Sequence, residues 1–218
     1  MQGQLGDLQV RVLAILAPIT PRWTLTGGAA LAGWHLQHRT TRDLDLFWHG
    51  LAAFVNEPAE CIGLLQQAGV AVHVLQRTPG FVRLRADQGG ETVVVDLVAE
   101  PVRNVAAPDV VQAGGASICI DSAYEILVNK LGAVLHRAEL RDLVDLRALL
   151  DRGADLAKAL ADANRKDGGF SPLMLGYLLQ GFPVAKQAQL AGLDAAATAA
   201  LVQFRDELVV RVARFAQP

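Results

Sequence analysis

At 218 residues, the chain is long enough to bury a core without disulfide bonds, and a hydrophobic fraction of 52% excludes a disordered protein. The formal net charge of −2 excludes the overall basic field that attracts nucleic acids or anionic membranes. The two cysteines lack CxxC spacing, and no apolar run approaches the roughly 20 residues of a membrane span. We therefore expect a cytoplasmic protein with free thiols and no membrane partner.

The first half of the chain alternates between helical and strand patterns. Helices are predicted at residues 5–17, 28–37 and 58–68, and strands at 23–25, 43–48, 70–76, 81–86, 92–98 and 117–120. Turn residues at 78–80 and 87–90 predict antiparallel hairpins between neighbouring strands. This half is therefore expected to be an α/β-type unit with a mixed β-sheet and flanking helices.

The second half of the chain is expected to be helical throughout. Ser122 followed by Glu125 is a capping-box signal, and Asp194 is expected to cap the last helix. The predicted helices cover residues 122–137, 139–151, 154–164, 171–181 and 194–215. The fold class is thus α+β, with a first domain at residues 1–121 and a C-terminal helical bundle at residues 122–218.

Two aspartates lie one residue apart in the segment RTTRDLDLFW, residues 39–48. Because side chains alternate along a strand, Asp43 and Asp45 point to one face while Leu44 and Leu46 point into the core. Two carboxylates this close repel one another unless a cation lies between them, and hard oxygen ligands favour Mg²⁺ or Mn²⁺. Taken alone, the pair favours a solvated strand face.

Asp96 lies in the strand segment TVVVDLVAE, which is otherwise too apolar to tolerate a charge without a purpose. If this strand pairs beside the first aspartate strand, Asp43, Asp45 and Asp96 converge. Three carboxylates can hold two metal ions, and paired metals suit in-line phosphoryl or nucleotidyl transfer. The three aspartates are therefore predicted to be metal ligands and catalytic residues.

A glycine pair follows the first strand, where Thr26, Gly27 and Gly28 lead into a helix. Glycines let the backbone approach a phosphate closely, and the start of a helix offers unpaired N–H groups. The pair alone is also compatible with a plain tight turn. It forms neither a Walker A loop nor a GxGxxG sequence, which argues against a P-loop NTPase or a dinucleotide-binding fold.

The segment TGGAALAGWHLQHRTTRDLDLF, residues 26–47, resembles the opening motif of the DNA polymerase β-type nucleotidyltransferase superfamily. More narrowly, it resembles the AbiEii-type toxins of bacterial abortive-infection and toxin–antitoxin systems. The resemblance implies that the glycine pair faces a triphosphate and that the three aspartates form the metal site. It also places Arg39 or Arg42 near phosphates, and the family's usual spacing favours Arg39.

The resemblance continues in AYEILVNKLGAVLHRAELRDLVDLRALL, residues 123–150. It implies that Lys130 contacts the triphosphate or nucleotide and that Arg141, Asp142 and Asp145 form a polar cluster facing the cleft. A lysine can neutralise charge that develops on phosphate, and an aspartate there could orient the lysine or accept a proton from an attacking hydroxyl. Without the resemblance, these residues read as ordinary charge pairs on a helix surface.

Together, the motifs predict a metal-dependent nucleotidyltransferase that moves an NMP from an NTP to a hydroxyl or phosphate. The resemblance implies a catalytic first domain, a helical domain that completes its cleft, a tRNA or other RNA acceptor, and a cognate antitoxin. Two alternatives are a non-catalytic nucleotide- or antitoxin-binding module and an antibiotic-type small-molecule nucleotidyltransferase. The chain is short for the toxin family, so parts that bind substrate are expected to be reduced.

Overall fold

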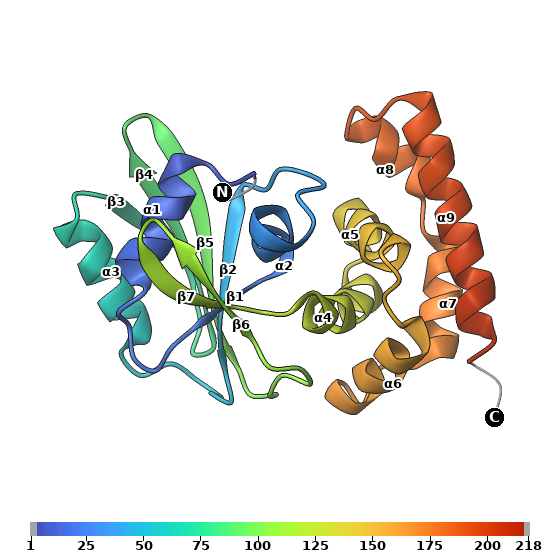
Figure 1. Ribbon diagram of the computed structural model, residues 1–218, viewed down its shortest axis with the longest axis horizontal. Coiled ribbons are helices and arrows are strands. Elements are labelled where there is room, and N and C mark those ends of the chain that lie inside the picture. The colour runs from blue at the N-terminus through green and yellow to red at the C-terminus, as the bar shows by residue number, and fades with distance from the viewer. Residues whose placement is uncertain (1–3, 216–218) are drawn as a thin grey trace. The chain divides into compact units, whose positions relative to one another are not determined.

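The computed structural model describes residues 4–215. The chain divides into two compact units, Met1–Glu125 and Ile126–Pro218, and the division falls in the first turn of α4 (Ala123–His136). A mixed sheet with flanking helices, followed by a helical region, confirms the predicted fold class (Figure 1). Within the described residues, no helix is both long and apolar enough to cross a membrane.

A seven-stranded mixed sheet forms the centre of the first unit, in the order β3-β4-β5-β2-β1-β7-β6. β2 pairs in parallel with β5 and antiparallel with β1, and β1 pairs in parallel with β7. The two predicted hairpins, β3-β4 and β4-β5, are antiparallel as expected. The strands are β1 (Thr24–Thr26), β2 (Asp43–His49), β3 (Ala71–Arg77), β4 (Phe81–Gln88), β5 (Glu91–Glu100), β6 (Asp109–Ala113) and β7 (Ala116–Ile120).

Helices α1 (Asp7–Leu16) and α3 (Glu57–Gln67) lie together on one side of this sheet (Figure 1). Side chains alternate between the two faces along β2. Leu44, Leu46 and Trp48 point into the core and are at most 1% exposed. Asp43 and Asp45 remain partly exposed on the other face. The sheet therefore presents an apolar face to its core and a charged face away from it.

The helix predicted at residues 28–37 is shorter and less regular than expected. α2 (Gly27–Ala30) continues directly into the π-helical turn η1 (Leu31–His35). Most of this segment is buried, and it packs beside β1 and β2. The chain reverses at Gln37, which has a φ of 54°, and then enters β2. This connection brings the glycine pair and the aspartate strand close together.

The second unit is helical, as predicted. Its last helix packs on α7 and α8 through a stripe of side chains at helical spacing, Leu201, Phe204, Leu208 and Val212, each at most 7% exposed. After α4, its helices are α5 (Leu140–Asp151), α6 (Leu156–Lys166), α7 (Pro172–Gly181), α8 (Val184–Leu190) and α9 (Ala195–Ala213).

Candidate active site

Four residues on the central strands form one row across the sheet. Arg83 of β4 lies opposite Asp96 of β5, and Asp96 lies opposite Asp45 of β2. Asp45 in turn lies opposite Thr26, the last residue of β1. Because neighbouring strands are about 4.8 Å apart and paired residues project to the same face, these side chains are close neighbours. β5 pairs beside β2, which is the condition on which the convergence of Asp43, Asp45 and Asp96 depends.

The glycine pair lies directly against two side chains of the predicted site. Gly27 has a φ of +65°, and a Cβ atom there would lie 2.6 Å from Oδ2 of Asp45. A Cβ atom at Gly28 would lie 2.5 Å from Nη2 of Arg39. Arg39 is therefore the arginine at the glycine turn, whereas the exposed Arg42 lines a separate cavity near the start of α1. Only glycine leaves room for both side chains here.

Replacing Gly27 with alanine should destabilise the protein more than the same change at Gly89. Both residues have positive φ, +65° and +60°, so both variants incur left-handed backbone strain of about 1–2 kcal/mol. Nothing lies within 4 Å of a Cβ atom at Gly89, whereas the new methyl group at Gly27 would collide with Asp45. Urea unfolding checks this expectation. Equal losses of unfolding free energy would show that the contact with Asp45 does not matter.

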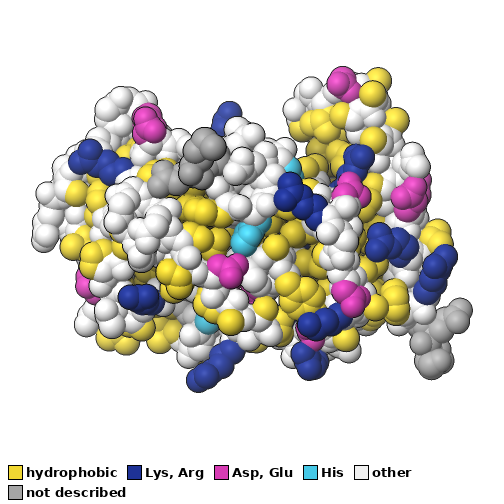
Figure 2. Space-filling view, viewed as in Figure 1, with side chains coloured by type: hydrophobic (Ala, Val, Ile, Leu, Met, Phe, Trp, Pro, Cys, Tyr) yellow, Lys and Arg dark blue, Asp and Glu magenta, His cyan; other side chains and the backbone are white. Residues whose placement is uncertain are grey.

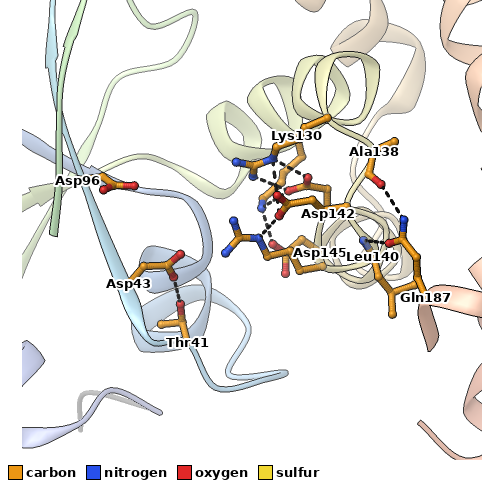
Figure 3. A network of polar contacts seen from close by, with 12 residues as sticks. Thr41, Asp43, Asp96, Lys130, Ala138, Leu140, Asp142, Asp145 and Gln187 are labelled. Carbon is orange, nitrogen blue, oxygen red and sulfur yellow. Dashed lines mark hydrogen bonds and ion pairs between the residues drawn. The ribbon is translucent and has the colours of Figure 1, made fainter. Parts of the chain in front are cut away.

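Asp43 and Asp45 present carboxylate oxygens on the charged face of the sheet. Oδ1 of Asp43 accepts a hydrogen bond of 2.7 Å from the Thr41 hydroxyl (Figure 3). Both side chains are half-buried, and their hard oxygen atoms fit a divalent cation. Among residues 4–215, no three His, Cys, Asp or Glu side chains are grouped so that they could hold a metal ion. A metal role for Asp96 beside the other two aspartates stays a prediction.

Arg83 occupies both oxygens of Asp96. Its Nε donates to Oδ1 at 2.7 Å and its Nη2 donates to Oδ2 at 2.6 Å, a bidentate pair in which Asp96 is 6% exposed. The hydrogen bonds to Asp96 raise the pKa of Arg83, and the charges of Asp96, Asp45 and Asp43 act in the same direction. Sequence reasoning missed Arg83. The two-residue Gly89-Gly90 turn was the available signal, because it sets the β4-β5 register.

In the second unit, Lys130 forms a buried ion-pair cluster with two aspartates of α5. Its Nζ lies 2.8 Å from Oδ1 of Asp142 and 2.7 Å from Oδ2 of Asp145 (Figure 3). Lys130 is 5% exposed and both aspartates are fully buried. The expected shared helix face of Asp142 and Asp145 is thus present. The alternative of ordinary surface charge pairs does not fit, because these groups are withdrawn from solvent.

Arg137 also belongs to this cluster, and sequence reasoning missed it. Its Nε and Nη2 each donate to Asp142 at 2.9 Å, whereas Arg141 pairs with Glu139 at 2.5 Å. Burial acts to raise the pKa of Asp142, but the Arg137 hydrogen bonds and the Lys130 charge together hold that pKa below its usual value. A predicted nucleotide contact at Arg141 stays a prediction. No helical spacing could reveal Arg137, because the chain turns between it and Asp142.

A model of the family described as "Nucleotidyl transferase AbiEii toxin, Type IV TA system" matches residues 11–212. A comparison with curated proteins gave no match. Among solved structures, the chain is similar to JHP933 from Helicobacter pylori, with 23% identity and a TM-score of 0.54 over 96% of this chain and 95% of that one. It is also similar to an antigenic nucleotidyltransferase-like protein from Paracoccidioides brasiliensis, with 18% identity and a TM-score of 0.53 over 88% of this chain and 97% of that one.

At these identities, the likeness to solved structures establishes the nucleotidyltransferase fold alone. The family model, in contrast, spans both units and includes the glycine turn, the aspartate strand and the lysine helix. The resemblance drawn from the two sequence motifs is therefore confirmed. The chain belongs to the AbiEii family of nucleotidyl transferase toxins of type IV toxin–antitoxin systems.

Proposed function

We propose that this protein transfers an NMP from an NTP to an end of tRNA and that the charged face of the sheet carries the chemistry. Family membership supplies the reaction class. The observation that carries the assignment of the site is the position of Asp45, which lies against the Gly27 backbone and opposite Asp96. A phosphate-binding turn and a carboxylate are thereby joined in one place.

The residues of the first unit are proposed to bind and orient the triphosphate. Asp43 and Asp45 would hold Mg²⁺ or Mn²⁺, which when bound neutralises phosphate charge and assists in-line displacement. β1 ends at Thr26. The next two residues, Gly27 and Gly28, have no side chain that would keep a phosphate oxygen away from the backbone. The Arg39 guanidinium, which lies against Gly28, is suited to donate to phosphate oxygens.

Lys130 is proposed to contribute a fixed positive charge to nucleotide binding. Two aspartates hold the Lys130 ammonium group, so the lysine side chain loses little further conformational freedom when it contacts the nucleotide. Asp142 and Asp145 are then positioning residues for Lys130, and Arg137 holds Asp142 in turn. Arg141 is also proposed to contact the nucleotide, as the family resemblance implies.

The acceptor and the partner follow from the family rather than from a surface feature. A type IV toxin has an NTP substrate and a cognate antitoxin. Figure 2 shows Lys and Arg side chains dispersed among other residues on the visible face, so recognition of tRNA is not expected to depend on a broad basic surface there. A protein or a small hydroxylated antibiotic would be a different class of acceptor, and the experiment below separates these classes.

Label transfer tests the proposed acceptor directly. Purified protein is incubated with Mg²⁺ and each α-labelled NTP, in separate reactions with total tRNA, ribosomal RNA, soluble protein or an aminoglycoside. We expect label on tRNA, loss of transfer in EDTA, and recovery with Mg²⁺ or Mn²⁺. Transfer to the aminoglycoside alone would identify an antibiotic-type enzyme. Tight NTP binding without transfer to any acceptor would identify a non-catalytic module.

A further inference from the structure

The Arg83–Asp96 pair places a cation of the protein itself on the third carboxylate of the charged face. Both Asp96 oxygens are engaged, at 2.7 and 2.6 Å, and the carboxylate is almost fully buried. A metal ion could take both Asp96 oxygens only after this bidentate pair opened, which would leave a buried carboxylate without its partner. The pair therefore competes with any ion for Asp96.

The surroundings of Arg83 hold it in this position. The guanidinium carbon lies 5.6 Å from the centre of the Phe81 ring, a distance at which a cation is attracted to the ring face. Arg83, Asp96 and Asp45 also share one row of the sheet, so the Arg83 side chain leaves the backbone on the same face as both carboxylates. Arg83 thus provides the positive charge that Asp96 would otherwise need from a metal ion.

The charges of the four groups also indicate that Arg83 serves as the cation of Asp96. Asp43, Asp45 and Asp96 carry three negative charges, and Arg83 removes one of them. Like charges on directly opposite strand residues repel, so Asp45 and Asp96 need one cation each or a shared one. Arg83 already provides the cation for Asp96.

We propose that Arg83 is the resident cation of Asp96 and takes the place of a second metal ion, so that the site binds one divalent cation, on Asp43 and Asp45. Arg83 is then a positioning residue that fixes the metal stoichiometry. This inference rests on the proposed function, since it assumes the metal site on the two aspartates. It replaces the sequence-based expectation of two metal ions shared by three carboxylates.

Mn²⁺ binding tests this inference without turnover. Free Mn²⁺ is followed by electron paramagnetic resonance while the full-length protein is titrated with Mn²⁺ alone. We expect one bound ion per wild-type chain and a second in Arg83→Met, whose Asp96 is released. Arg85→Met is the matched control, because Arg85 lies two residues away on β4 and pairs with the half-buried Asp87. It should bind one ion, as the wild type does.

Two further variants separate the possible failures. Arg83→Lys keeps the charge but not the bidentate geometry, so it should fold and bind Mn²⁺ between the wild type and Arg83→Met. Two ions in the wild type, or identical binding by Arg83→Met, Arg83→Lys and Arg85→Met, would overturn the role of Arg83. Undiminished Mn²⁺ binding by Asp43→Asn/Asp45→Asn would instead contradict the metal site of the proposed function.

Discussion

Replacing Asp45 with asparagine should abolish NMP transfer while leaving the fold about as stable as the wild type. Asparagine keeps the shape of the side chain but removes the charge that would hold the cation beside Gly27. We expect a loss of activity of about a hundred- to a thousandfold or more. The free energy of unfolding should change little, because the replacement removes both a repulsion from Asp96 and Asp43 and an attraction to Arg83.

The matched control for this variant is Asp87→Asn. Asp87 lies on β4 in the same sheet, but it is engaged by Arg85 and Thr92 away from the glycine turn. Its replacement should change activity by no more than about twofold. Label transfer and urea unfolding are measured on both variants. A loss of activity in Asp45→Asn that merely followed a loss of stability would argue for a structural role of Asp45 and against the proposed site.

Replacing Lys130 with methionine should produce the largest loss of stability. The change removes the ammonium group that two fully buried carboxylates, Asp142 and Asp145, share. Breaking a buried pair in this way typically costs about 3–5 kcal/mol of unfolding free energy. Urea unfolding measures the loss. The exposed Lys186 on α8 provides the control, because Lys186→Met should remain within about 0.5 kcal/mol of the wild type.

A second change separates the two roles of Lys130. In Lys130→Met/Asp145→Asn, the excess negative charge is gone and the Arg137–Asp142 pair remains, so much of the stability should return. If Lys130 also contacts the nucleotide, the double variant should be folded and still bind NTP poorly. Recovery of both stability and NTP affinity would show that Lys130 serves the fold alone.

Sequence patterns predicted the central part of the fold well, because burial imposes clear periodicity there. β2 alternates strictly, so its range and the face of Asp43 and Asp45 could be predicted. β6 was missed because this edge strand is mostly exposed and lacks alternation. α8 was missed because seven residues after Pro183 are too few to display a helical period.

The candidate site was predictable only where its residues form local motifs. The glycine turn and the aspartate pair are each contiguous in sequence, so their types and spacing suggested a function. The partners that complete them come from tertiary pairing: Arg83 reaches Asp96 through the register of a hairpin, and Arg137 reaches Asp142 across a helix break. Until the pairing is known, a charged residue in either place cannot be told from any other solvent-exposed charge.

The most direct test of the proposed site compares two positions of the label on the same NTP. With Mg²⁺ and tRNA, the wild-type protein should transfer the α-phosphate label to the acceptor and release the γ-phosphate label as pyrophosphate. Asp45→Asn should do neither, while Asp87→Asn should do both. Transfer of the γ label, or undiminished transfer of the α label by folded Asp45→Asn, would contradict nucleotidyl transfer at this face of the sheet.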